Sequence, residues 1–154
     1  VDHAIERPAE LATDTASKLP AIQHCFRTAE TLSGFKFDTV VDLDATSPFR
    51  NQEDLKGVIE LLESHEQITN VITGAPARRS PYFILVELDE SGGVHLSGKR
   101  RSINKNIVIR QDAPPCYDMN ASIYAWWRNS LLKARHVIQS GTRLYVMPEE
   151  RSVD

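Results

Sequence analysis

The stretch between residues 39 and 74 constrains the fold most, because two apolar segments flank a helical one. "TVVDL" (39–43) is almost continuously apolar, like strands that are buried on both faces of a sheet. Asn51 with Asp54 three residues later is a variant of the capping box, and apolar residues then recur at helical spacing. "NVITG" (70–74) is a second buried strand. The order predicts a right-handed parallel strand–helix–strand crossover, and therefore an α/β fold with a mostly parallel sheet.

The segments outside this unit continue the pattern. Residues 17–34 have an apolar stripe at helical spacing between a capping serine and a closing glycine, which predicts a helix. Further along, a strand is expected at 121–126, a helix at 130–139 and a strand at 143–147. We therefore expect one α/β body that is formed from both ends of the chain.

Residues 77–115 have a different pattern. "YFILVEL" and "GVHLS" flank "DESGG", which is typical of a hairpin turn. The basic run "KRRSINKN" and the apolar segment "IVI" follow. We expect a β-rich arm at 77–115 that projects from a body made of residues 1–76 and 116–154.

Composition argues against several classes of protein. The net charge of −3 gives no general attraction to nucleic acid or to anionic lipid. The sequence shows neither an apolar run long enough to span a bilayer nor a signal-type beginning, so a cytoplasmic location is expected. The two cysteines, Cys25 and Cys116, have no metal-ligand spacing, and we expect both to be buried as small apolar residues.

The segment "VVDLDATSPFR" (40–50) has two interpretations. As D-x-D-x-T after a strand, it gives Asp42 as the nucleophile and Asp44 as the general acid of an aspartyl-phosphate phosphatase. That chemistry also needs a lysine and a later acidic cluster for magnesium, and no strand-end acidic pair follows at a suitable position. As T-S-P-x-R, the same segment is the floor of a nucleotide-sugar synthetase, which the other motifs favour.

Four motifs occur in a fixed order: "RPAELATDTAS" (7–17), "DATSPFRNQEDL" (44–55), "IRQDAPPCYDMNASIY" (109–124) and "YVMPEERSVD" (145–154). Together they resemble the cytidylyltransferases that activate nine-carbon α-keto sugar acids, the CMP-sialic acid synthetases and their relatives. The resemblance is greatest to the branch that makes CMP-legionaminic acid. It implies a Rossmann-like αβα nucleotidyltransferase body whose 77–115 arm pairs two subunits into a homodimer.

The resemblance also implies site residues, each with a chemistry that suits its type. Arginine holds carboxylates and phosphates bidentately, and carboxylates with phosphate oxygens suit Mg²⁺. The implied set comprises nucleotide-binding Arg7, Ala16 and Ser17; sugar-binding Asp44, Thr46, Ser47, Gln111, Asn120 and Tyr124; and catalytic Arg110 and Asp154, with Asp154 also a ligand of Mg²⁺.

Three positions depart from the pattern of the sialic-acid enzymes. One is Phe83 in the arm, where many of those enzymes have a lysine, so carboxylate binding by that residue is not implied here. Those enzymes usually have glutamine where this chain has Asp44, and the glycine of their N-G-A-I-Y motif is replaced here by Ala121. A carboxylate at position 44 can accept hydrogen bonds from sugar hydroxyls or amides, but it repels a substrate carboxylate unless it is offset. The departure at Asp44 favours a legionaminate-type substrate.

For a complete enzyme, the resemblance implies attack of the sugar's anomeric hydroxyl on the α-phosphorus of CTP, with release of pyrophosphate. The glycine-rich phosphate loop of such enzymes has no counterpart in residues 1–154. We therefore expect this chain to be the middle and C-terminal part of a longer enzyme, and to be inactive by itself. The alternative is a non-catalytic paralogue that keeps the arm.

Overall fold

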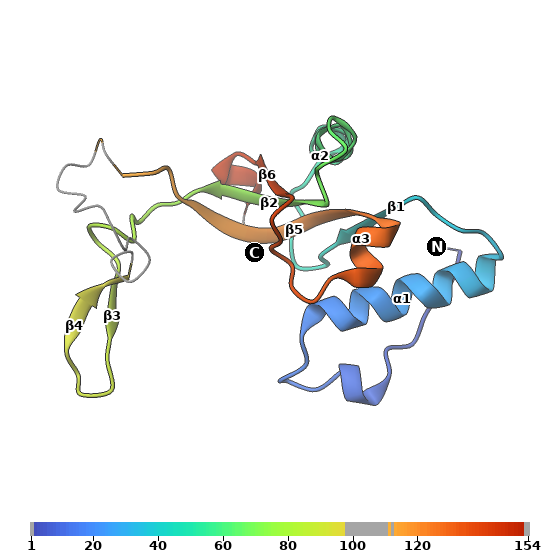
Figure 1. The fold of residues 1–154 in the computed structure, drawn as a ribbon, viewed down its shortest axis with the longest axis horizontal. Coiled ribbons are helices and arrows are strands. Elements are labelled where there is room, and N and C mark those ends of the chain that lie inside the picture. The colour runs from blue at the N-terminus through green and yellow to red at the C-terminus, as the bar shows by residue number, and fades with distance from the viewer. Residues whose placement is uncertain (1, 98–110, 112, 153–154) are drawn as a thin grey trace.

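The computed structural model describes residues 2–97, 111 and 113–152. In this part of the chain a four-stranded sheet separates α2 on one face from α1 and α3 on the other, and a two-stranded hairpin projects from the body (Figure 1). The elements are α1 (Lys18–Ser33), β1 (Thr39–Leu43), α2 (Gln52–Glu63), β2 (Asn70–Pro76), β3 (Val86–Leu88), β4 (Val94–Leu96), β5 (Tyr117–Trp127), α3 (Arg128–Lys133) and β6 (Thr142–Val146), with 3-10 turns at Ala9–Leu11 and Glu149–Arg151.

The two faces of the sheet carry separate apolar clusters. Side chains alternate between faces along a strand, so Tyr124 and Trp126 of β5 pack toward α1, whereas Ile123 and Ala125 pack toward α2. The α1 face also contains Leu19, Ile22, Phe26, Ile72 and Leu131, and the α2 face contains Val58, Leu62, Ile68 and Val71. The sheet is therefore covered on both sides. β2 is buried, as its apolar run predicts, but the prediction that 39–43 is also a buried strand is wrong, because β1 lies at an edge of the sheet and its residues are half-buried or exposed. No helix among the described residues is both long enough and apolar enough to cross a lipid bilayer.

The topology of the sheet differs from the prediction. The strand–helix–strand unit exists, and β1 and β2 run in the same direction, but β5 lies between them in the order β1-β5-β2-β6. β5 is antiparallel to both neighbours, and only β2 and β6 pair in parallel. The sheet is thus mixed, and the prediction of a mostly parallel sheet is wrong for two of its three pairings. Local periodicity identifies strands, but it does not say which distant strand fills the space between two of them.

Helix boundaries are partly as predicted. Gly34 ends α1 in the left-handed region at φ 72°, and the capping box of Asn51 and Asp54 forms with both of its hydrogen bonds. Ser17 occupies the N-cap position of α1, but its side chain makes no capping hydrogen bond. The helix expected at 130–139 is shorter than predicted. α3 ends at Lys133, because the backbone becomes extended at Ala134.

The prediction that both cysteines are buried is wrong. Cys25 is exposed and Cys116 is half-buried. Cys25 belongs to the face of α1 that borders a hollow rather than the sheet, whereas Ile22 and Phe26 of the same helix are in the core.

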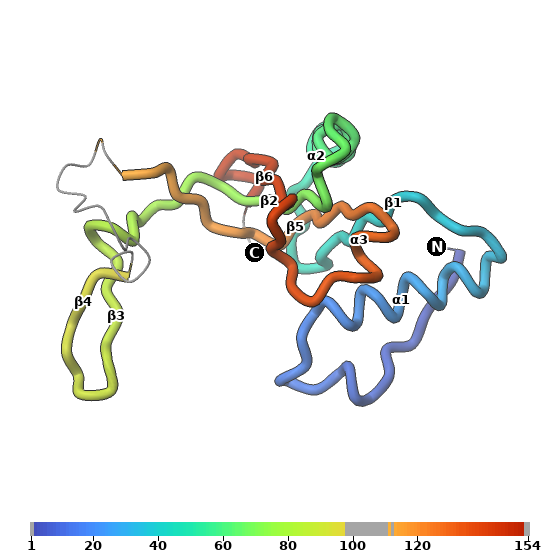
Figure 2. The backbone as a smooth tube through the Cα atoms, viewed as in Figure 1, coloured from blue at the N-terminus to red at the C-terminus, as the bar shows by residue number. Residues whose placement is uncertain are grey.

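The expected hairpin is confirmed. β3 and β4 pair antiparallel, with Val86 opposite Leu96, and form a sheet of their own away from the body (Figure 2). In the turn, the carboxylate of Asp89 accepts hydrogen bonds from the backbone N–H groups of Ser91 and Gly93. The basic run that follows and the expected strand at 107–109 lie outside the described residues.

A bulge in β5 shapes the sheet within the segment Y-D-M-N-A-S (117–122). The β2–β5 register shifts between Ile72, which lies opposite Tyr124, and Gly74, which lies opposite Met119. Within the bulge, Ala121 has φ 51°, the left-handed region that favours glycine. The irregular backbone makes room for residue 120 to turn inward.

The positive φ at residue 121 gives the first prediction. Ala121→Gly is expected to raise the free energy of unfolding by about 1 kcal/mol, because the Cβ penalty in the left-handed region exceeds the extra chain entropy of glycine. Denaturant unfolding should show a higher midpoint at an unchanged m-value. Ala125→Gly is the control in the same strand and should be destabilising, because Ala125 is a fully buried core residue. Equal destabilisation by both changes would contradict the prediction.

Candidate functional site

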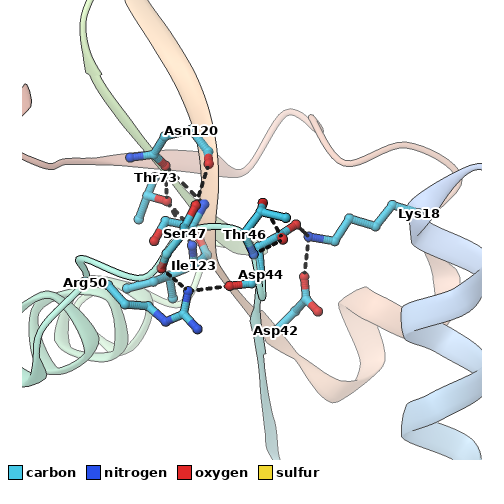
Figure 3. A network of polar contacts seen from close by, with 10 residues as sticks. Lys18, Asp42, Asp44, Thr46, Ser47, Arg50, Thr73, Asn120 and Ile123 are labelled. Carbon is cyan, nitrogen blue, oxygen red and sulfur yellow. Dashed lines mark hydrogen bonds and ion pairs between the residues drawn. The ribbon is translucent and has the colours of Figure 1, made fainter. Parts of the chain in front are cut away.

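A polar network begins where β1 ends and α1 starts. The Lys18 ammonium lies 2.9 Å from Asp42 Oδ2 and 2.8 Å from Asp44 Oδ2, so one cation bridges both carboxylates (Figure 3). The same ammonium is 5.0 Å from the centroid of the Tyr124 ring, within range of a cation–π contact. These contacts join the first residue of α1 to β1 and β5.

Asp44 uses both of its carboxylate oxygens within the chain. Oδ1 accepts hydrogen bonds from the Thr46 backbone N–H at 3.0 Å and from its hydroxyl at 2.9 Å. The hydrogen bond from Lys18, and then that from the Thr46 backbone, hold the pKa of the Asp44 carboxyl far below its usual range. Burial alone would lower the pKa of Lys18, but the hydrogen bonds to Asp44 and Asp42 outweigh it and raise the pKa above 10.5. Lys18 and Asp44 are thus both charged at neutral pH.

The T-S-P turn (residues 46–48) is fixed by Arg50. The Arg50 guanidinium donates hydrogen bonds to the backbone carbonyls of Asp44 and Ser47, the latter at 2.6 Å. Ser47 is buried, and its hydroxyl donates to the backbone carbonyl of Asn120 at 3.4 Å. Arg50 therefore closes the turn on itself, while Ser47 connects it to β5.

Asn120 is the buried centre of the network. Its side-chain oxygen accepts a hydrogen bond from the Thr73 hydroxyl at 2.7 Å, and its side-chain nitrogen donates to the Ser152 hydroxyl at 2.9 Å. Thr73, which is fully buried, also accepts from the Ile123 backbone N–H. Asn120 thus connects the T-S-P turn, β2, β5 and the C-terminal turn (residues 149–152).

A buried ion pair fastens the C-terminal turn a second time. The Asp54 carboxylate is fully buried and accepts hydrogen bonds from Arg151 Nε at 3.0 Å and Nη2 at 2.8 Å. Burial alone would raise the pKa of Asp54, but the hydrogen bond from Arg151, followed by that from the Asn51 backbone, lowers it. Arg151 on Asp54 and Ser152 on Asn120 together fix the end of the described chain against α2 and β5.

Two hollows border this network. One, of about 200 Å³, lies between the N-terminal segment, α1 and β1, and it includes Arg7, Lys18 and Asp42 in its lining. The other, of about 310 Å³, includes Asn120 and Ser152 in its lining, where β2, β5 and the C-terminal turn meet.

The residues that the sequence predicts fall into several places. Asp44, Thr46, Ser47 and Asn120 belong to one hydrogen-bond network (Figure 3). Tyr124 is buried in the core beneath α1. The remaining predicted residues are Arg7, which lines the first hollow; Ala16 and Ser17, just before α1; the exposed Gln111; and Arg110 and Asp154, which lie outside the described residues.

Sequence reasoning did not identify Lys18, Thr73 or Arg151 as parts of this region. The one signal for Lys18 was the D-x-D pair, because two strand-end carboxylates need a cation nearby. Asp54 was predicted only as a capping residue, and its burial against Arg151 has no local signature.

Metal ligands do not gather in the described part of the chain. In residues 2–97, 111 and 113–152, no group of three or more histidine, cysteine, aspartate or glutamate side chains is placed to share a metal ion. Mg²⁺ requires less than this, since it is usually held by one or two carboxylates together with substrate phosphates.

The chain was compared with known proteins, and no family model matches it. It is 39% identical to the post-translational flagellin modification protein B of Campylobacter coli and 40% identical to the CMP-N,N'-diacetyllegionaminic acid synthase of Campylobacter jejuni, each over 149 residues. These alignments cover 97% of this chain and 60% of each relative. The N-acylneuraminate cytidylyltransferase of Escherichia coli is 26% identical over 149 residues, which is 96% of this chain and 33% of that protein.

The chain thus spans about 60% of the length of the first two relatives. Similarity at this level over almost all of its residues confirms the resemblance that the four motifs indicate. The chain is homologous to the CMP-legionaminic acid synthase and the flagellin modification protein B, and more distantly to N-acylneuraminate cytidylyltransferase.

Proposed function

We propose that the protein containing this chain transfers CMP from CTP to a nine-carbon α-keto sugar acid of the legionaminic or sialic acid type and releases pyrophosphate. The observation that carries this proposal is the 40% identity to a CMP-legionaminic acid synthase over 149 residues. The hydrogen-bond network supports it, because it brings parts of three of the four motifs together around the bulge of β5. The same homology favours the T-S-P-x-R interpretation over a phosphatase.

In this proposal the chain acts mainly by positioning. Arg7, Ala16 and Ser17 lie before α1 and bind the cytidine. The T-S-P turn supports the sugar, with Thr46 exposed at its surface and Ser47 buried beneath. Since Arg50 closes the turn through two backbone carbonyls, its shape is set before a ligand arrives.

Asn120 and Tyr124 complete the sugar site in this proposal. Two of the remaining proposed residues, Arg110 and Asp154, carry charge. Arg110 and Gln111 contact the sugar acid or the phosphates. Mg²⁺ is proposed to be held by Asp154, where it would neutralise charge on the triphosphate. What the described residues contribute is the double fastening of the C-terminal turn, which ends two positions before Asp154.

The proposed body, a Rossmann-like nucleotidyltransferase unit of residues 1–76 and 116–154, is accompanied by a dimerisation arm at 77–115. The hairpin supports this role, because Val86, Leu88 and Val94 are 53%, 70% and 67% exposed. Two strands with apolar side chains in water are marginal by themselves. A second subunit that covers them would produce the proposed homodimer.

Incubation of the full-length protein with CTP, Mg²⁺ and either legionaminic acid or sialic acid tests the proposed function. Pyrophosphate release and a CMP-sugar detected by mass spectrometry are expected with at least one acid, and loss of both on addition of EDTA. ATP in place of CTP is the matched control and should give no product.

In this proposal residues 1–154 alone are inactive, because the glycine-rich phosphate loop of such enzymes has no counterpart among them. A full-length dimer without product from any nonulosonic acid would favour a non-catalytic paralogue. Hydrolysis of phosphomonoesters without CTP would favour a phosphatase.

A further inference from the structure

Two carboxylates at the end of β1 create an electrostatic problem. Asp42 belongs to β1 and Asp44 follows its last residue, and their carboxylates share one cation. Both side chains are only partly exposed, at 22% and 26%. The proposed substrates, CTP and a sugar acid, are anions. Unpaired carboxylates here would repel one another and the ligands.

Lys18 resolves this problem through a bridge. Its ammonium binds one oxygen of each carboxylate at 2.8–2.9 Å and lies over the Tyr124 ring. With 36% of its side chain exposed, Lys18 is shielded from water more than a surface lysine, so its ion pairs are less screened. The Lys18 charge compensates one of the two carboxylate charges. Contacts from α1, β1 and β5 together fix the position of the ammonium.

The bridge also fixes the direction of one carboxylate. Lys18 holds Asp44 Oδ2, and the other oxygen, Oδ1, receives the backbone N–H and hydroxyl of Thr46. The carboxylate plane therefore connects the start of α1 to the T-S-P turn (Figure 3). Removal of the ammonium would leave Asp44 Oδ2 without its cation, so the hydrogen bonds from Thr46 to Oδ1 would no longer be tied to the start of α1.

We propose that Lys18 is a positioning residue for the sugar site: by bridging Asp42 and Asp44 it fixes Asp44 under the T-S-P turn and determines affinity for the sugar acid. This inference rests on the proposed function and assigns a role to a residue that is not among the predicted nucleotide-binding, sugar-binding or catalytic residues. Lys18 acts through Asp44 and Thr46, not on the reacting atoms.

The experiment uses the full-length protein with Lys18→Met, which keeps the length of the side chain but removes its charge. The KM for the sugar acid should rise by about tenfold or more, with a smaller change in kcat and in the KM for CTP, because hydrogen bonds to charged groups are lost. Lys18→Arg should recover most of the loss. Lys56→Met, at an exposed position on α2, is the matched control and should be unchanged.

A pH profile separates positioning from a general loss of structure. Without Lys18, the pKa of Asp44 should rise from its lowered value, so the acid limb of kcat/KM should move to higher pH. The groups that face Lys18 are Asp42, Asp44 and Tyr124, and Glu6, Arg7, His24 and Cys25 line the adjoining hollow. Asp44 is the bridged carboxylate that also accepts the two hydrogen bonds from Thr46.

The double variant Lys18→Met/Asp42→Asn keeps the net charge of the site unchanged. It should retain the raised KM for the sugar acid, because Asp44 still lacks its cation, and it provides a second test if the single variant folds poorly. A wild-type KM in either variant, or a rise in the KM for CTP alone, would overturn the role of Lys18 while leaving the proposed function intact. An inactive wild-type protein would overturn both.

Discussion

Asp54→Ala is expected to lower the free energy of unfolding by about 3 kcal/mol, because it removes one partner of a buried ion pair. The change deletes two hydrogen bonds from Arg151 and the capping bond from the Asn51 backbone. Of the two contacts described for the C-terminal turn, Arg151 with Asp54 and Ser152 with Asn120, only the second would remain. Denaturant unfolding of residues 1–154 measures the loss.

The control for Asp54 is its neighbour Glu53, an exposed acidic residue in the same first turn of α2. Glu53→Ala should change stability by less than about 0.5 kcal/mol. Because the folded-state pKa of Asp54 is lowered, its stabilisation is present above the ordinary carboxyl pKa of about 3.9 and is lost as pH falls toward the folded value. The difference between wild type and Asp54→Ala should therefore shrink in acid. A difference that grows in acid would contradict the ion-pair explanation.

Asn120→Ala should also have a large effect, about 3 kcal/mol on stability, since it leaves the fully buried Thr73 hydroxyl without its amide partner. In the full-length protein we also expect kcat/KM to fall by about 100-fold, because the T-S-P turn and the C-terminal turn lose their common anchor. Unfolding curves and steady-state kinetics measure the two effects separately.

Asn129→Ala is the matched control, since Asn129 is exposed and its side-chain oxygen accepts a long, 3.5 Å hydrogen bond from its neighbour Arg128. It should alter neither stability nor kinetics appreciably. If Asn120→Ala retained wild-type kinetics after correction for the folded fraction, Asn120 would be a structural residue without a positioning role.

The sequence was sufficient where local chemistry decides the outcome. The apolar run at 39–43, the capping box at Asn51 and the hairpin turn at Asp89 each depend on residues within a few positions of one another. The related enzymes have glycine at the position of Ala121, and the left-handed backbone at this residue explains why glycine suits it.

The sequence was insufficient where partners are distant along the chain. Lys18 meets Asp44 across 26 positions, and Arg151 meets Asp54 across 97. Neither contact changes the spacing of apolar residues in its own segment. A charged residue at a helix start therefore gives the same sequence pattern whether its side chain is exposed or buried in an ion pair. The residues with predicted ligand roles came from family resemblance, and those that hold them in place came only from the structure.

The insertion of β5 between β1 and β2 has a consequence for biosynthesis. A ribosome releases residues 39–76 before residues 117–127, so the first two strands of the sheet emerge without the strand that joins them. Until then both strands have open hydrogen-bonding edges, which can pair with other nascent chains. The body should therefore acquire its sheet late in translation, and chains that stall within the arm should depend on chaperones.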